Sequence, residues 1–127
     1  MPLVRIDLPQ SIEARAAREI GEAINRAMNE VINVPAGDKF QIITRSAAGG
    51  RNVTPEYLGI RYSEELVMIQ ITLNQGRSVE LKRAFYQRVA DDLEQLGLRR
   101  EDVFINLVEV PKENWSFGNG EMQYGPK

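Results

Sequence analysis

Hydrophobic and polar positions follow two different periodicities along the chain. Residues 3–8 alternate between apolar and polar side chains, which predicts a strand. Apolar residues then recur every three or four positions over 20–31, which indicates an amphipathic helix, and 38–44 predicts a second strand. Pro9 should end the first strand because proline has no N–H for the ladder, and Ser11 is the expected N-cap of the helix.

The same order of elements returns later in the chain. Residues 66–73 predict a strand, Ser78 is the expected N-cap of a helix, and apolar residues recur at helical spacing over 81–96. Gly97 should end this helix, because glycine readily adopts the left-handed conformation of a C-cap. A closing strand is predicted at 102–108. The two halves therefore match in kind and in order.

This repetition predicts the fold class, which is α/β (α+β). Each half is a β-α-β unit with parallel strands, and two units give a four-stranded mixed sheet with two helices on one face. We expect a single domain over 1–127 with pseudo-repeats at about 2–45 and 66–110 and a C-terminal tail at 111–127. A short extra strand is expected at 57–62, in the connection between the halves.

The closing strand is apolar on both sides. Val103, Ile105 and Leu107 should point one way, and Phe104 and Val108 the other. Strands that are apolar on both faces are normally buried on both faces. Because so short a chain has little left to cover the second face, we expect a homo-oligomer.

Composition narrows the possible functions. The net charge is -2 without a basic run, so we expect no nucleic-acid partner. No apolar stretch reaches the roughly 20 residues of a membrane span, and no signal peptide is evident, so a cytoplasmic protein is expected. The chain has no Cys and no His. This excludes disulfides, cysteine catalysis and Ser–His triads, and we expect no metal and no cofactor.

Pro2 is the first candidate for the missing general base. Methionine is generally removed before a small second residue, which would leave a free prolyl amine. An α-amino group titrates near pH 8, and burial or a nearby cation lowers its pKa towards neutrality. The neutral amine could then act as a base. Taken alone, Pro2 is also a common second residue without any chemical role.

Further candidates follow from local context. Arg77 lies beside a helix N-terminus, a position that already favours anions, and a guanidinium can grip a carboxylate with two hydrogen bonds. Asp38 could position a water, orient the amine or hold a carbonyl, although it is also an ordinary residue for a turn. Trp115, Phe117 and Tyr124 could wall an apolar pocket, or simply belong to a core or interface.

Together these residues resemble the tautomerase superfamily, and most closely its malonate semialdehyde decarboxylase branch. The likeness is carried by Met1-Pro2-Leu3, by Val-Pro-Ala-Gly-Asp-Lys-Phe-Gln at 34–41, by Arg77-Ser78 with Lys82 and Phe85, and by Asn-Trp-Ser-Phe-Gly-Asn-Gly at 114–120. The resemblance spans nearly the whole chain. It implies a homotrimer of duplicated β-α-β subunits.

The resemblance also implies roles for single residues. Pro2 would be the catalytic amine, Arg77 would bind or polarise the substrate carboxylate or carbonyl, and Asp38 would assist. Trp115 and Phe117 would form an apolar wall, which Tyr124 would complete. The decarboxylase pattern has two arginines in the turn before the second helix, separated by one residue. Here Gln75 takes the first position, and it can donate a hydrogen bond but carries no charge.

Three functions remain open on the sequence. The leading hypothesis is a tautomerase that moves a proton on a small 2-oxo (enol) carboxylic acid with Pro2 as base. The second is decarboxylation of a 3-oxo acid such as malonate semialdehyde. The third is a non-catalytic module that binds small molecules in the same pocket. In each case the partner is a small carboxylate.

Overall fold

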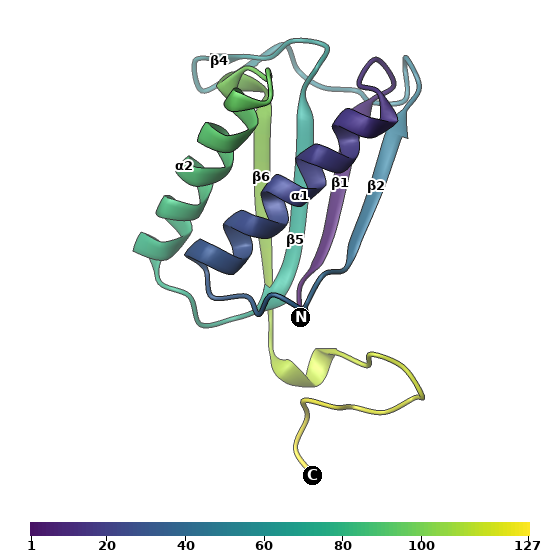
Figure 1. Ribbon diagram of the computed structural model, residues 1–127, viewed down its shortest axis with the longest axis vertical. Helices are drawn as coiled ribbons and strands as arrows, with labels where there is room; N and C mark the ends of the chain where they lie inside the picture. Colours follow the sequence, from purple (N-terminus) through teal and green to yellow (C-terminus); the bar gives the residue numbers. More distant parts are fainter.

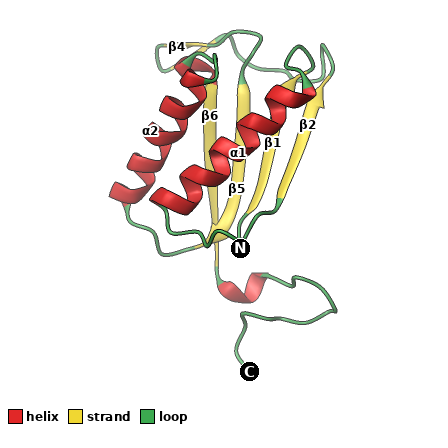
Figure 2. Ribbon diagram, viewed as in Figure 1, coloured by secondary structure: helices red, strands yellow, loops and turns green.

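A twisted four-stranded sheet carries both long helices on one face (Figures 1 and 2). The computed structural model describes residues 1–127. The strands of this sheet are β1 (Leu3–Pro9), β2 (Gln41–Ser46), β5 (Val67–Asn74) and β6 (Val103–Val110), in the order β2-β1-β5-β6. The helices are α1 (Ala14–Val31) and α2 (Val79–Gln95), with short 3-10 turns at Arg100–Asp102 and Lys112–Asn114.

Strand direction confirms the duplicated β-α-β design. Strand β1 is parallel to β2, and β5 is parallel to β6, as a helical crossover requires. The two central strands are antiparallel, and Leu3 pairs with Thr72. The start of β1 therefore lies at the same end of the sheet as the finish of β5 and β6. We call this the lower end, as it is drawn in Figure 1.

The core lies between the helices and the inner face of the sheet. Alternate residues of β1 and β5 point inwards, which matches the predicted strand periodicity. The helices contribute the apolar residues of their inner faces. The largest fully buried side chains include Ile6, Leu8, Ile20, Ile24, Met28, Ile69, Ile71, Leu73, Phe85 and Leu93. Each such side chain contributes about 1.5–3 kcal/mol relative to an exposed one.

The outer face of the sheet has no helix over it. Val103, Ile105 and Leu107 pack against the core, as expected, whereas Phe104 and Val108 point outwards and are 38% and 36% exposed. The apolar character of both sides of β6 is thus confirmed. A single protomer covers one of these two sides.

The start of α1 differs from the prediction. The helix begins at Ala14, and Glu13 occupies the N-cap position without a side-chain cap bond. Ser11 is not the cap, because a turn closed by the Ile12 N–H and the Pro9 carbonyl (3.1 Å) occupies this stretch and buries Ile12. The N-cap of α2 was correct, since the Ser78 hydroxyl accepts from the Leu81 N–H at 3.1 Å.

Two further boundaries were refined. Strand β2 begins at Gln41 rather than at Asp38, because the Asp38 N–H closes a turn with the Pro35 carbonyl (3.0 Å) instead of joining the ladder. The expected extra strand is a small hairpin of β3 (Glu56–Tyr57) and β4 (Ile60–Arg61). Gly97 ends α2 as predicted, with φ at +98°, a left-handed conformation that costs glycine little. No helix in the chain combines the length and apolar character that a membrane crossing needs.

Candidate active site

The chain's amino terminus lies against Asp38. The ammonium group of Met1 is 2.5 Å from Asp38 Oδ2, and Pro2 is buried at the entry to β1. In this chain Met1 makes the Pro2 nitrogen a peptide nitrogen. Loss of Met1 would transfer the terminal amine to Pro2, one residue closer to the buried strand. The observed partner of Asp38 is thus the ammonium of Met1, one residue before Pro2.

Arg77 is fixed at the same lower end by two backbone carbonyls. Its Nε donates to the Ile32 carbonyl at 2.8 Å, and its Nη1 donates to the Asn74 carbonyl at 3.1 Å. The side chain thus links the end of α1 to the end of β5. Its hydrogen-bond partners are neutral carbonyls, although Glu109 lies close enough for the charge of Arg77 to help lower the pKa of that carboxylate. The guanidinium is therefore a fixed cation that could bind an anion at this end. The Nη2 group makes no hydrogen bond within the chain.

Glu109 is a charged residue near this turn that the sequence analysis missed. It accepts a hydrogen bond from Lys82 Nζ at 2.5 Å and a long one from the Gly76 N–H at 3.4 Å. The Lys82 bond is the main cause that lowers the pKa of Glu109 below its ordinary value of 4.5. The Lys82–Glu109 pair therefore contributes fully to the free energy of unfolding when the pH is above 4.5. The contribution is lost as the pH falls through the lowered pKa of Glu109.

A signal for Glu109 was present in the strand pattern. The positions 103, 105 and 107 of β6 face the helices and are apolar, and 109 continues the same alternation. A carboxylate in that series indicates a partner on the covering helix, which here is Lys82. The pair holds the first turn of α2 against the end of β6.

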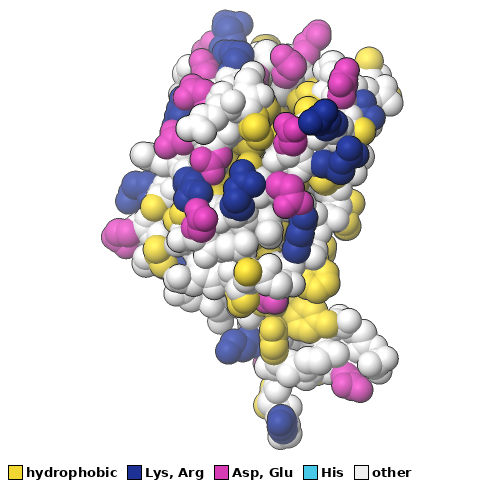
Figure 3. All heavy atoms as spheres, viewed as in Figure 1, with side chains coloured by type: hydrophobic (Ala, Val, Ile, Leu, Met, Phe, Trp, Pro, Cys, Tyr) yellow, Lys and Arg dark blue, Asp and Glu magenta, His cyan; other side chains and the backbone are white.

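Gln75 and the aromatic residues also lie at the lower end. The Gln75 N–H bonds to the Val110 carbonyl at 3.0 Å, while its side chain is exposed. The Trp115 and Phe117 rings stack at 5.4 Å, and Tyr124 packs edge-on against Phe117 at 5.1 Å. The three aromatic side chains thus form one cluster on the C-terminal tail. Figure 3 shows hydrophobic side chains gathered where this tail leaves the body.

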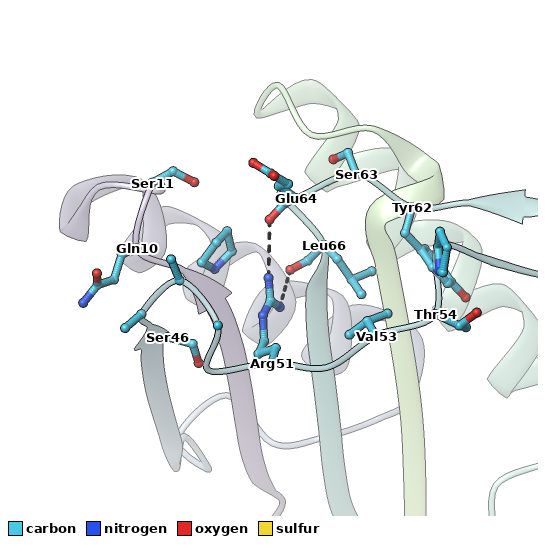
Figure 4. A pocket seen from close by; sticks show the side chains of 15 residues that line it. Gln10, Ser11, Ser46, Arg51, Val53, Thr54, Tyr62, Ser63, Glu64 and Leu66 are labelled. Atoms are coloured by element: carbon cyan, nitrogen blue, oxygen red, sulfur yellow. Dashed lines mark hydrogen bonds between the residues drawn. The ribbon is translucent and has the colours of Figure 1, made fainter.

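A cavity of about 630 Å³ lies at the opposite end of the sheet (Figure 4). Arg51 points into it, but its guanidinium is bound to the Leu66 carbonyl at 2.6 Å and lies 3.4 Å from Asp7. Nearby, the buried Asp102 accepts from both the N–H and the hydroxyl of Ser63. Arg51 and Asp102 are thus bound to neighbouring groups of the chain, whereas Asp7 Oδ1 is buried without a hydrogen-bond partner. None of the predicted site residues lines this cavity.

Comparison with known proteins identifies the family. Residues 38–118 match the family model described as tautomerase enzyme. The chain is 39% identical to the probable tautomerase YusQ of Bacillus subtilis (strain 168), over 97% of this chain and 98% of that protein. It is 29% identical to the probable tautomerase YrdN of the same organism, over 98% and 96% of the two chains. The chain belongs to the tautomerase family of enzymes.

Solved structures place it beside one branch of that family. A malonate semialdehyde decarboxylase inhibited by 3-bromopropiolate is 34% identical, with a TM-score of 0.89 over 96% of this chain and 93% of the other. A second malonate semialdehyde decarboxylase, described as having decarboxylase and hydratase activities, is 28% identical with a TM-score of 0.87 over 96% and 95%. The resemblance to the decarboxylase-like branch is therefore confirmed.

Proposed function

We propose that the protein is a cofactor-independent tautomerase that moves a proton on a small 2-oxo carboxylic acid with the Pro2 amine as general base. The observation that carries the proposal is the position of Asp38 against the chain's amino terminus, at the end of the sheet where Arg77 is fixed. A base, a residue that can orient it and a cation thus occur together. The family assignment supports the same class of reaction.

The proposed step conserves all atoms of the substrate. The neutral Pro2 amine takes a proton from the carbon next to the 2-oxo group, and negative charge develops on the carbonyl oxygen. Arg77 stabilises that oxygen or holds the carboxylate. The Pro2 ammonium then returns the proton to the oxygen or to another carbon, so the product is an isomer. Trp115 and Phe117 would wall the pocket and exclude water.

The protonation state of Pro2 separates this reaction from its alternative. In the proposed site, burial and a nearby cation would favour the neutral amine, which is a base, whereas a carboxylate partner would favour the ammonium, which is an acid. An ammonium would polarise the carbonyl of a 3-oxo acid while carbon dioxide leaves. That second candidate, decarboxylation of a substrate such as malonate semialdehyde, is supported by the 34% identical decarboxylase.

Gln75 gives the means to test the two reactions against each other. We expect processed wild-type protein to ketonise enolpyruvate, and to release carbon dioxide from malonate semialdehyde at the background rate. Gln75→Arg should raise carbon dioxide release from malonate semialdehyde about tenfold above that background, because a charge-assisted hydrogen bond to the carboxylate replaces a neutral one. The measurements are enol absorbance and released carbon dioxide. Rapid carbon dioxide release by the wild type, without ketonisation, would favour the decarboxylase.

The third candidate, a binding module without catalysis, is tested by intact mass. A retained Met1 would keep the Pro2 nitrogen in a peptide bond, where it cannot act as a base. Processed protein that binds small carboxylates and turns over neither substrate would support the binding module.

We also propose that the protein is a homotrimer in the cytoplasm. The exposed apolar residues Ile42, Phe104 and Val108 on the uncovered face of the sheet support association, and two fold relatives are described as trimers of fused 4-OT. Sedimentation should give a mass about three times the 14.4 kDa chain. A monomer mass at micromolar concentration would contradict this.

A further inference from the structure

We propose that Asn74 is a positioning residue that holds the aromatic wall and Arg77 in one arrangement at the lower end of the sheet. Asn74 is the last residue of β5 and pairs with Val110 of β6. It lies two residues beyond Thr72, whose partner on β1 is Leu3. It is therefore level with the chain's amino terminus and lies between the first and last strands.

Two of its atoms bind two different parts of the proposed active site. The side-chain Oδ1 accepts a hydrogen bond from Trp115 Nε1 at 2.8 Å. The main-chain carbonyl accepts from Arg77 Nη1 at 3.1 Å. One half-buried residue thus links the indole to the guanidinium, although neither is its neighbour in the strand.

The Trp115 bond is what ties the end of the chain to the body. It is the only hydrogen bond between residues 115–127 and the rest of the chain, because the others in this segment are internal. Phe117 stacks on Trp115, and Tyr124 packs edge-on against Phe117. Loss of the Asn74 acceptor would therefore release the whole aromatic cluster from its polar anchor.

The chemistry of indole also fixes the orientation of the Asn74 amide. An indole N–H is a donor only, so the amide must present its oxygen to Trp115 and turn its NH₂ group away. That Nδ2 group makes no hydrogen bond within the chain and is not sealed from solvent.

The test is a double-mutant cycle of Asn74→Ala with Trp115→Phe, which keeps an aromatic ring but removes the N–H. Its kinetic arm rests on the proposed function and uses enolpyruvate. We expect each variant to raise KM about tenfold and to change kcat less than threefold, with an unchanged pH profile. The double variant should stay within twofold of either single variant, because both remove the same bond.

The fluorescence emission of Trp115 tests the role of Asn74 without any need for enzyme activity. Trp115 is the only Trp in the chain, so its emission reports on the wall alone. Asn74→Ala should shift this emission to the red, whereas the matched control Asn52→Ala, in the exposed linker, should not. An unchanged emission, or kinetic effects that simply add, would overturn the inference. A wild type without ketonisation would reject the proposed function, while the emission shift would still decide the role of Asn74.

Discussion

Replacement of Pro2 by Ala should lower kcat/KM for enolpyruvate ketonisation about 10²- to 10⁴-fold, the range expected when a positioned general base is lost. Alanine also permits removal of Met1, so a terminal amine remains. That amine is primary, no longer constrained by the ring, and poorly placed against Asp38. The measurement is steady-state kinetics on protein whose processed N-terminus has been verified by mass.

The matched control for this variant is Pro9→Ala. Pro2 directly precedes strand β1, and Pro9 is the last residue of that strand, at the opposite end of the sheet. The Pro9→Ala variant also removes one proline ring from β1, and it should keep the wild-type kcat/KM. Thermal unfolding of both variants verifies that they fold. Full activity in folded Pro2→Ala would exclude the prolyl amine as the base.

Arg77→Ala should lower kcat/KM about 10²- to 10³-fold, as for loss of a donor to a developing oxyanion. The change also removes the donors to the Ile32 and Asn74 carbonyls, and about 1–3 kcal/mol of unfolding free energy should be lost with the two bonds. Arg77→Lys keeps the charge without the planar fork, so it should fall between the wild type and Arg77→Ala. Kinetics and urea unfolding measure the two effects separately.

Arg51→Ala separates stability from activity. Arg51 also donates to a backbone carbonyl, that of Leu66, and it lies at the far end of the sheet. The Arg51→Ala variant should lose about as much free energy of unfolding as Arg77→Ala and keep the wild-type kcat/KM. If Arg77→Ala were destabilised to the same extent but fully active, Arg77 would be a structural residue alone.

The sequence predicted features that depend on neighbours along the chain. The order of elements, the Ser78 cap and the Gly97 terminus follow from local periodicity and capping chemistry, and the structure has them. Ser11 failed as a cap because burial of Ile12 in the core outweighs the preference of a serine for the first helical turn. Such tertiary effects are absent from any local pattern.

Contacts between the two halves were beyond local reasoning. Arg77 binds the carbonyl of Ile32, which belongs to the other half of the chain, and Trp115 reaches back to Asn74. The first bond follows from the antiparallel pairing of β1 with β5, which brings one end of each half to the same place, and the second from the pairing of Asn74 with Val110 at the end of β6. The sequence indicated the chemical types at the site but not the bonds that fix them.

The approximate two-fold relation between the halves has a consequence for stoichiometry. Asp38 faces the chain terminus, whereas Asp102, its counterpart before β6, holds the interior segment at Ser63. Under the proposed function, only the end of the sheet that holds Asp38 would carry the reactive amine, because Asp102 at the opposite end is engaged by Ser63 instead of by a terminal amine. The two pseudo-equivalent ends would then differ in role, with one reaction centre in each protomer.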